Sequence, residues 1–346
     1  MQKCIELALK GIKEVAPNPM VGCIIVHENK IIGKGYHEKY GEAHAEINAI
    51  NSVKNKNLLK EATLYVNLEP CSHYGLTPPC SLAIIQNKIP KVIIGTKDPF
   101  PKVSGGGIQM LKDAGIEVTT DILRSECESL NKRFFTFHLK KRPYIFLKWA
   151  QSADGYIDTE RDYLTTKAYK FSNKETKLFS HQKRANEAAI LIGTNTAIKD
   201  NPSLTVRLCE GENPLRLIID RELKTPHSYH LYDNSTKTVF FTEKQAISST
   251  DKTLFINIDF KRNIIKQMLA YLYENQQTSL IVEGGTQLLN SFIEANIWDE
   301  IHIETATEVF LKKGIKAPNF IEKNLTKEMI FNKNKLKIYK NKDNEY

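Results

Sequence analysis

Hydrophobic and polar positions alternate along residues 1–142 in a way that predicts an α/β unit with strands and helices in layers. The first element is an amphipathic helix in residues 1–16, with apolar positions at helical spacing at Ile5, Ala8, Leu9, Ile12 and Ala16. A β-hairpin follows in residues 21–37, with its turn at 27–30, and a helix then begins at His44. The remaining elements alternate, with strands at 62–68, 91–96 and 116–120 and helices at 80–88 and 107–115.

The alternation pauses at a polar, helix-like segment, residues 122–143, and starts again after it. We therefore predict a boundary at Arg142 and Pro143, with domains at 1–142 and 143–346. The second domain is also expected to be α/β, and no internal repeat relates the two halves. Its predicted strands are 144–150, 188–194, 215–220, 237–242 and 279–285, and its predicted helices are 173–186 and 286–296. The Lys- and Asn-rich run 332–346 is interpreted as a C-terminal tail.

Composition excludes several classes of protein. The 346 residues carry a formal net charge of +9, which could indicate a nucleic-acid partner. The lysines alternate with Glu, Asp and Asn instead of forming a patch, so we expect no nucleic-acid partner. No apolar run is long enough to span a bilayer, and no secretory signal is visible. We therefore expect a cytoplasmic protein without membrane contact, whose six cysteines form no disulfide framework.

The residue types His44, Cys71 and Cys80 predict a zinc site. Three protein ligands leave a fourth position for water, which is the catalytic arrangement. Glu46 follows His44 by two residues, so the two side chains converge only if the metal lies off the start of the helix. Cys80 follows two prolines that favour a helix start, where the thiol pKa is lowered. A structural site would need a fourth ligand, for which His73 is the local alternative.

The order H-x-E followed by P-C and a second Cys is the signature of zinc deaminases. In such enzymes zinc activates the water that attacks the base, and the glutamate carries protons to the leaving ammonia. We therefore assign a catalytic role to Glu46. Nucleobase deaminases usually space their cysteines C-x-x-C, whereas here residues 72–79 separate them and must loop over the site.

The second domain has weaker signals when it is read alone. Gly284 and Gly285 lie between a predicted strand and a predicted helix, where backbone N–H groups can bind a phosphate, although an ordinary tight turn explains them as well. The pattern is not that of a Rossmann fold. Lys148 lies within an apolar strand and must either pair with an acid or act on a substrate.

Several motifs together resemble the bifunctional deaminase/reductase family of riboflavin biosynthesis, and the resemblance covers essentially the whole chain. The motifs are residues 16–23, 35–37, 71–80, 97–107, 142–155, 188–207, 215–220 and 281–292. The resemblance implies a cytidine-deaminase-like α/β/α layered domain followed by a dihydrofolate-reductase-like α/β domain. It also implies Zn²⁺ and NADPH as cofactors, a pyrimidine ribosylamine phosphate as substrate, and a homo-oligomer.

The resemblance also implies roles for individual residues, and places Lys148 at the sugar of the substrate. In the first domain the implied substrate-binding residues are Asn18, His37, His73 and Asp98. In the second they are Arg161, Arg184, Leu204, Arg207 and Glu283. The implied cofactor-binding residues are Ala150, Tyr163, Thr196, Asp200, Gly285, Thr286, Gln287, Leu288, Leu289, Asn290 and Ser291.

Four positions depart from the family pattern. Leu76 stands where a basic residue is usual, Phe100 where Asn is usual, Tyr163 where Trp is usual, and Arg161 where Ser is usual. These changes affect the expected contacts to phosphate and cofactor, and leave the groups that act on the reacting atoms in place.

The expected function is zinc-dependent deamination of the pyrimidine, followed by NADPH-dependent reduction of its ribosyl side chain to ribityl. One alternative is an RNA or nucleobase deaminase with an accessory binding domain. It predicts aromatic and basic residues beside the zinc motif, and residues 44–50 and 78–86 contain none. The other alternative is a structural zinc protein whose second domain binds a regulatory nucleotide.

Overall fold

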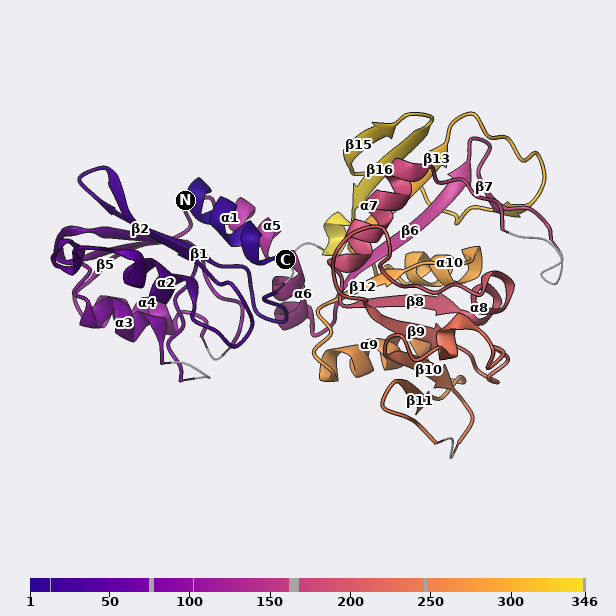
Figure 1. Cartoon of the computed structure of the whole chain (residues 1–346), viewed down its shortest axis with the longest axis horizontal. Helices are drawn as coiled ribbons and strands as arrows, with labels where there is room; N and C mark the ends of the chain where they lie inside the picture. The colour runs from indigo at the N-terminus through magenta and orange to yellow at the C-terminus, as the bar shows by residue number, and fades with distance from the viewer. Residues whose placement is uncertain (13, 75–77, 102, 162–167, 246–247, 345–346) are drawn as a thin grey trace. The chain divides into compact units, whose positions relative to one another are not determined.

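The structure is a computed structural model that describes residues 1–346 except 13, 75–77, 102, 162–167, 246–247, 345 and 346. The chain divides into two compact units, Met1–Lys141 and Arg142–Tyr346 (Figure 1). This division lies one residue before the boundary predicted from the sequence. Among the described residues, no helix has the length and apolar character needed to cross a bilayer.

The N-terminal unit is built on a five-stranded sheet. Its strands are β1 (Gly22–His27), β2 (Lys30–Tyr36), β3 (Thr63–Leu68), β4 (Lys91–Thr96) and β5 (Glu117–Thr119), in the spatial order β2-β1-β3-β4-β5. Strand β1 is antiparallel to β2 and β3, whereas β3, β4 and β5 are parallel. The predicted hairpin turn is confirmed, because Glu28 and Asn29 both have positive φ, as the tight turn between twisted strands requires.

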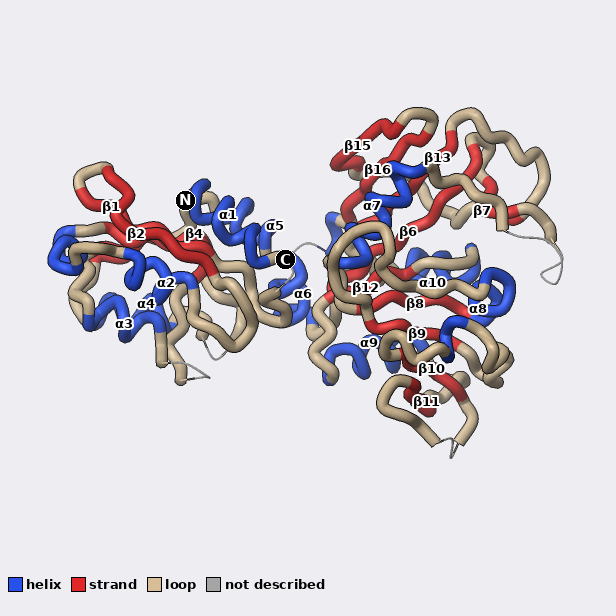
Figure 2. Tube along the Cα trace, in the orientation of Figure 1, coloured by secondary structure: helices blue, strands red, loops and turns tan. Residues whose placement is uncertain are grey.

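Helices cover both faces of this sheet. They are α1 (Gln2–Ala8), α2 (Ala45–Ser52), α3 (Cys80–Gln86), α4 (Gly106–Asp113), α5 (Arg124–Leu130) and α6 (Lys132–Lys140), with 3₁₀ turns at Leu9–Gly11 and Lys56–Glu61. Helices α1 and α5 lie on one face, and α2, α3 and α4 on the other (Figures 1 and 2). The α/β/α layering predicted from the sequence is therefore confirmed. Helix α2 packs closely on β2, because a Cβ on Gly35 would lie 2.4 Å from the backbone nitrogen of Ala49.

The predicted first helix is too long. Regular α-helix ends at Ala8, and a 3₁₀ turn follows. Beyond it, Ile12 still packs against a small buried cluster that contains Ala8 and Val15. Ile5 and Ala8 are buried as predicted, but Leu9 is 46% exposed, and Cys4 takes a core position instead.

The C-terminal unit contains a nine-stranded sheet in the order β11-β10-β9-β8-β12-β6-β13-β16-β15. The strands are β6 (Tyr144–Ser152), β8 (Ala189–Gly193), β9 (Leu215–Ile219), β10 (Thr238–Thr242), β11 (Thr253–Asn257), β12 (Ser279–Val282), β13 (Glu300–Ala306), β15 (Leu325–Phe331) and β16 (Asn334–Lys340). Neighbours from β11 to β13 are parallel, and β16 and β15 continue the sheet antiparallel. A separate antiparallel pair joins β7 (Tyr156–Asp158) and β14 (Ile315–Lys316).

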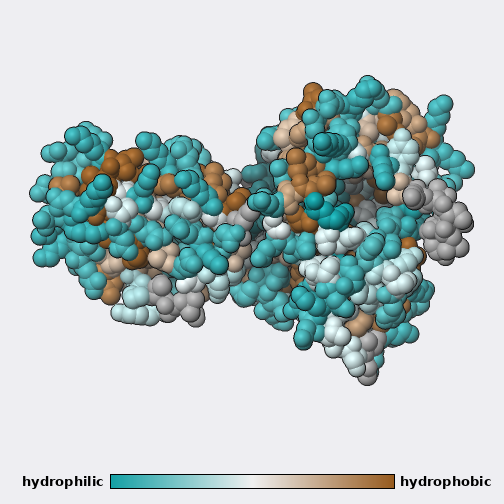
Figure 3. Space-filling view, in the orientation of Figure 1, coloured by the Kyte–Doolittle hydropathy of each residue, from teal (hydrophilic) through white to brown (hydrophobic). Residues whose placement is uncertain are grey.

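Hydrophobic clusters cover both faces of this sheet. The helices are α7 (Lys174–Ala185), α8 (Thr194–Asp200), α9 (Ile264–Glu274) and α10 (Thr286–Glu294), with 3₁₀ turns at His230–Tyr232 and Lys342–Asn344. On the face of the molecule seen in Figure 3, hydrophilic residues cover most of both units, and hydrophobic ones form separate groups.

Several elements of this unit were not predicted, and one prediction was wrong. Helices α8 and α9 and strands β11, β13 and β15 have no counterpart among the predicted elements. The Lys- and Asn-rich run interpreted as a tail contains strand β16, which pairs with β13 and β15. Asn334, Leu336 and Tyr339 of this strand are buried, whereas its lysines are only half-buried.

Candidate active sites

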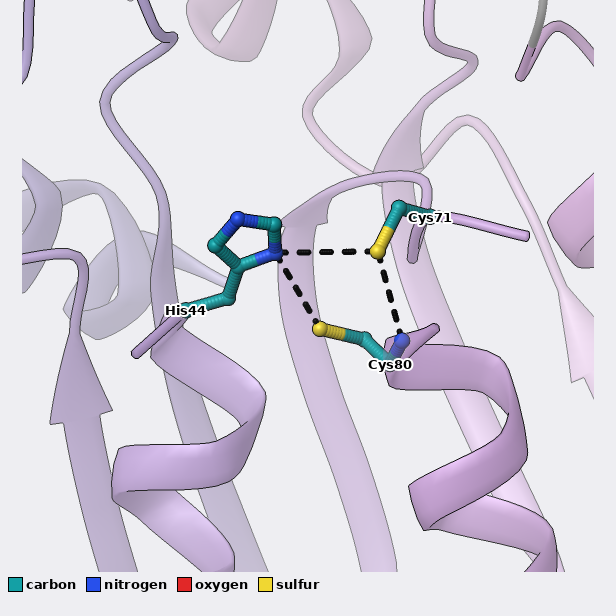
Figure 4. A group of neighbouring side chains, drawn as sticks. All are labelled: His44, Cys71 and Cys80. Carbon is teal, nitrogen blue, oxygen red and sulfur yellow. Dashed lines mark hydrogen bonds between the residues drawn. The ribbon is translucent and has the colours of Figure 1, made fainter. Parts of the chain in front are cut away.

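Three side chains from separate segments of the N-terminal unit meet at one point (Figure 4). His44 is the N-cap of α2, Cys71 follows β3, and Cys80 is the first residue of α3. The Nδ1 atom of His44 lies 3.3 Å from Cys80 Sγ and 3.6 Å from Cys71 Sγ, and the three atoms all lie within 4.8 Å of one another. One imidazole nitrogen and two sulfurs that converge in this way are a donor set that zinc takes, with room for water as fourth ligand.

The local sequence explains why two helices begin here. His44 has extended backbone angles, so its side chain leaves the chain just before α2 starts. Pro79 precedes Cys80 and is also extended, which sets the start of α3 at the second cysteine. The hydroxyl of Ser81 donates to the carbonyl oxygen of Cys71 at 2.9 Å and anchors the segment that carries the other sulfur.

The first N–H of α3 acts on Cys71, whereas the sequence analysis placed the effect of the helix start on Cys80. The backbone N–H of Cys80 donates to Cys71 Sγ at 3.2 Å. Hydrogen bonding from the Cys80 side chain, together with His44 and this N–H, lowers the pKa of Cys71. The pKa of Cys80 is raised by its hydrogen bond to Cys71 and by burial. The helix start thus acts on the neighbouring sulfur, because its first free N–H points there.

Glu46 lies one residue inside α2 and is 3% exposed. Burial raises its pKa to about 7, and the nearby His44 acts in the opposite direction. A cation held by the three ligands would favour the carboxylate further. Glu46 is not one of the three clustered ligands, so its carboxylate is available to exchange protons beside them.

Two of the substrate-binding residues implied for this unit contact each other. His37 Nδ1 lies 3.2 Å from the carbonyl oxygen of Ala43, so Nδ1 carries the hydrogen and Nε2 is an acceptor. Asn18 Nδ2 then donates to His37 Nε2 at 3.1 Å. The ring of His37 lies edge-on to that of His44, with centroids 5.2 Å apart. Asn18 and His37 are therefore held beside the zinc ligands in defined orientations.

His73 and Phe100 form an aromatic row with His138 of α6. The ring centroids of His73 and Phe100 are 6.1 Å apart, and those of Phe100 and His138 are 4.9 Å apart. The Nδ1 atom of His73 is buried and has no hydrogen-bond partner among the described residues. His73 is not part of the three-ligand cluster. Leu76, the other departure in this region, lies outside the described residues.

Sequence reasoning missed Glu69, whose buried carboxylate connects the segment of Cys71 to a second loop. Its Oε1 accepts hydrogen bonds from the backbone N–H groups of Gly107 and Ile108, at 3.0 and 3.1 Å. Its Oε2 accepts from those of Asp98 and Gly105, at 3.2 and 3.0 Å. Glu69 therefore holds the start of α4 and Asp98, whose pKa is raised to about 7 by burial. No sequence motif shows this role, because all of the partners are backbone groups.

We predict that Glu69→Gln destabilises the N-terminal unit by about 1–3 kcal/mol, because either orientation of the amide turns an NH₂ group toward two N–H donors. Calorimetric unfolding should show a lowered transition, and deamination should fall while reduction continues. Asp220→Asn is the matched control in the C-terminal unit, where Asp220 accepts from the backbone N–H groups of Lys224 and Thr225. Unchanged unfolding and deamination in Glu69→Gln would contradict this role.

A cavity of about 880 Å³ in the C-terminal unit contains most of the residues implied for the second site. Those that line it are Lys148, Ala150, Arg161, Arg184, Thr196, Asp200, Arg207, Glu283, Gly285, Thr286, Gln287 and Asn290. The side chains of Leu204 and Leu289 are buried in the hydrophobic clusters instead. Leu288 packs against the core, and the hydroxyl of Ser291 donates to the carbonyl oxygen of Gln287. Tyr163 lies outside the described residues.

The Gly-Gly turn between β12 and α10 borders this cavity. Gly284 has a φ of 120°, which favours glycine, and a Cβ there would lie 2.9 Å from Thr196 Oγ1. The N–H of Gly285 donates to the same oxygen at 3.1 Å, and α10 begins at the next residue. A backbone exposed at a helix start suits a phosphate, and the cavity is large enough for a dinucleotide such as NADPH.

Two cations of the cavity, Lys148 and Arg184, pair with the same acid. The Nζ atom of Lys148 lies 3.7 Å from Glu283 Oε1, and an Nη atom of Arg184 lies 3.4 Å from Glu283 Oε2. Although burial opposes it, these two cations lower the pKa of Glu283. Lys148 therefore does pair with an acid, in a position where it also lines the cavity.

The guanidinium of Arg161 forms ion pairs with two carboxylates of the same unit. Its guanidinium contacts Asp158 at 2.6 Å and also pairs with Asp200. The same group donates to the carbonyl oxygen of Lys199 at 3.1 Å. The resemblance implied substrate binding by Arg161 and cofactor binding by Asp200, and the structure joins the two side chains in one cluster at the cavity wall.

Comparisons with known proteins agree with this division of chemistry. Residues 1–96 match the cytidine and deoxycytidylate deaminase zinc-binding region, and residues 143–310 match the RibD C-terminal domain. The riboflavin biosynthesis protein RibD of Aquifex aeolicus is 40% identical over 314 residues, 89% of this chain and 86% of that protein. RibD of Bacillus amyloliquefaciens is 40% identical over 330 residues, 93% of this chain and 86% of that protein.

A solved structure is similar over both units. It is the crystal structure of a diaminohydroxyphosphoribosylaminopyrimidine deaminase/5-amino-6-(5-phosphoribosylamino)uracil reductase from Thermotoga maritima. The TM-score is 0.87 and the identity 33%, over 98% of this chain and 97% of that one. The first unit is thus cytidine-deaminase-like, and the second is a RibD reductase domain of the dihydrofolate-reductase type. The chain carries a zinc-ligand cluster and a cofactor-sized cavity, and its sequence is similar to these relatives over most of its length. The chain therefore belongs to the RibD family of bifunctional riboflavin biosynthesis deaminase/reductases.

Proposed function

We propose that the two units catalyse successive steps on one pyrimidine. The N-terminal unit hydrolyses the 2-amino group of 2,5-diamino-6-(5-phosphoribosylamino)pyrimidin-4(3H)-one to a carbonyl and releases ammonia. The C-terminal unit then reduces the ribosyl side chain to ribityl, which gives 5-amino-6-(5-phosphoribitylamino)uracil. The observation that carries this proposal is the convergence of His44, Cys71 and Cys80 beside the buried Glu46, in a chain that also carries a reductase domain.

In the deaminase unit, His44, Cys71 and Cys80 would hold zinc, which when bound supplies the Lewis acid that activates the attacking water. Glu46 takes the proton from that water and passes it to the departing amine nitrogen. Asn18 binds the pyrimidine through its amide oxygen, and His37, whose two ring nitrogens contact Ala43 and Asn18, holds that amide in position. The burial of Glu46 supports this role, because its carboxyl group is shielded from bulk water that would compete for the proton.

In the reductase unit, the Gly-Gly turn and the start of α10 would hold phosphate groups of NADPH, which when bound supplies the hydride. Lys148 donates a proton that opens the ribose ring to an imine, the form that accepts hydride. Glu283 holds the ammonium group of Lys148 in place, and Arg184 and Arg207 bind the phosphate of the substrate. The cavity that contains all four side chains supports this arrangement.

The test is to supply each unit with its own substrate and to alter Lys148. The unmodified chain should release ammonia from the diaminopyrimidine and should oxidise NADPH only after deamination. Lys148→Met should lower NADPH oxidation by about 10²–10⁴-fold, because an apolar side chain of similar length cannot donate the proton. Ammonia release should stay at the unmodified rate. Normal NADPH oxidation by Lys148→Met would contradict the role given to this lysine.

The remaining expectations concern assembly and location. We propose a homo-oligomer, which the exposed edge strand β15 supports, because Ile330 in it is 70% exposed. We also propose a cytoplasmic enzyme without a nucleic-acid partner. The lysines alternate with Glu, Asp and Asn along the chain, which argues against a basic patch.

A further inference from the structure

His181 lies in the cavity of the C-terminal unit but has no role in the mechanism described above. It is on α7, three residues before Arg184, so both side chains project from the same face of the helix. Both line the cavity, and His181 is 8% exposed. A nearly buried imidazole that borders a binding cavity is placed to contact what the cavity binds.

The hydrogen bonds of His181 define which ring nitrogen is a donor. Its Nδ1 atom accepts a hydrogen bond from the backbone N–H of Arg207 at 3.0 Å. Burial lowers the pKa of His181 to about 4, and the charges of Arg184 and Arg207 add to this effect. The ring is therefore neutral, with its hydrogen on Nε2. Among the described residues, no group accepts a hydrogen bond from this Nε2–H.

The two arginines beside His181 are arranged to bind an anion. Arg184 and Arg207 both donate to the carbonyl oxygen of Thr205, at 3.0 and 3.4 Å, so two like charges are held close together. Glu283 offsets only part of this charge. The Nε atom of Arg184, a residue that is 9% exposed, is buried without a hydrogen-bond partner among the described residues. Like charges and unused donors in one place are stabilised when an anion binds between them.

We propose that His181 is a third ligand for the substrate phosphate in the reductase site, and that its Nε2–H donates a hydrogen bond to a phosphate oxygen next to Arg184 and Arg207. The inference rests on the proposed function, which assigns the phosphate to these two arginines. A neutral donor adds a directed hydrogen bond without adding a third cation to the cluster. His181 thereby contributes to the choice of a phosphorylated sugar over an unphosphorylated one.

Two substitutions separate this contact from a structural role of the ring. The amide of Asn lies about as far from Cα as Nδ1 of His, so His181→Asn keeps an acceptor for the N–H of Arg207 and loses the Nε2–H donor. The amide of Gln reaches the position of Nε2, so His181→Gln keeps a donor there and loses the Nδ1 acceptor. If His181 binds the phosphate, His181→Asn should bind it more weakly than His181→Gln does. If His181 only supports Arg207, His181→Gln should be the weaker of the two variants.

The measurement is calorimetric titration of the full-length chain with ribose 5-phosphate, and with ribose as the unphosphorylated probe. We expect His181→Asn to bind ribose 5-phosphate about ten- to a hundredfold more weakly, the effect of one hydrogen bond to a charged acceptor. His181→Gln should retain most of the affinity, and ribose binding should not change in either variant. His227→Asn is the matched control, because His227 is exposed and does not line the cavity.

Steady-state reduction adds a second readout. His181→Asn should raise KM for the phosphorylated substrate with little change in kcat, and should leave KM for the dephosphorylated substrate as it was. Equal weakening in both variants, weakening only in His181→Gln, or no weakening in His181→Asn would overturn the inference. If Arg184→Gln and Arg207→Gln also leave ribose 5-phosphate binding unchanged, the proposed phosphate site itself is wrong. If only the arginine variants weaken binding, the proposed function stands and the role of His181 is rejected.

Discussion

Glu46→Gln should slow deamination by about 10²–10⁴-fold, the usual effect of losing a general acid–base group, while zinc stays bound and reduction continues. Glutamine keeps the size of the side chain and one acceptor oxygen, but it cannot take up a proton from the attacking water. Zinc binding should persist because Glu46 is not among the clustered ligands. Glu46 is 3% exposed, so a neutral amide also avoids burying a charge, and the fold should tolerate it.

The measurement supplies each unit with its own substrate. Ammonia release is followed with the diaminopyrimidine, and NADPH oxidation with substrate that has already been deaminated. Glu42→Gln is a matched control, because Glu42 lies four residues earlier in the chain and is exposed. If Glu46→Gln loses both activities while folded and loaded with zinc, the two reactions do not occupy separate sites. A single composite site would then explain the chemistry better.

The reacting groups of the first site could be predicted because they belong to rare residue types at informative spacings. His44, Cys71 and Cys80 are residue types that commonly bind zinc together. Glu46 follows His44 by two residues, and this separation placed the predicted metal off the start of a helix. The structure brings these ligands together as expected. What spacing could not show is the direction of the first N–H of α3, which donates to the sulfur of Cys71.

Residues that act through the backbone of distant segments could not be predicted from the sequence. Glu69 accepts its hydrogen bonds from N–H groups in residues 98–108, and His181 accepts one from Arg207. Backbone donors are the same at every position, so no residue pattern marks them. These partners become visible only when the loops are folded against one another.

The strands at the end of the second sheet were missed for a related reason. The face of β13 formed by Glu300, His302 and Glu304 is polar, although each of these residues is at most 5% exposed. Tyr144 donates to Glu300 and Ser172 donates to Glu304 from other segments, while His302 contacts Glu300 within the strand. A strand normally shows itself by an apolar buried face, so a buried polar face looks like a solvent-exposed segment. Strand β16 was misread because its intervening lysines dominate the composition.

Cys71→Ser should remove zinc from the chain and reduce deamination to the background rate. A serine hydroxyl is a poor substitute for a thiolate, because zinc binds deprotonated sulfur and the hydroxyl stays protonated near neutral pH. Elemental analysis of the purified chain should give about one zinc per chain before the change, and little after it.

Two further variants decide what the loss of metal means. His73→Ala should keep its full zinc content, because His73 lies outside the ligand cluster and contacts Phe100 instead. Cys209→Ser should also keep zinc and both activities, since Cys209 is in the C-terminal unit. NADPH oxidation with deaminated substrate should survive in all three variants, because the reductase cavity lies within the other unit. Full zinc in Cys71→Ser, or loss of zinc in His73→Ala, would show that the metal is held by a different set of ligands. The second result would favour a closed structural site, in which no position remains for the water that deamination requires.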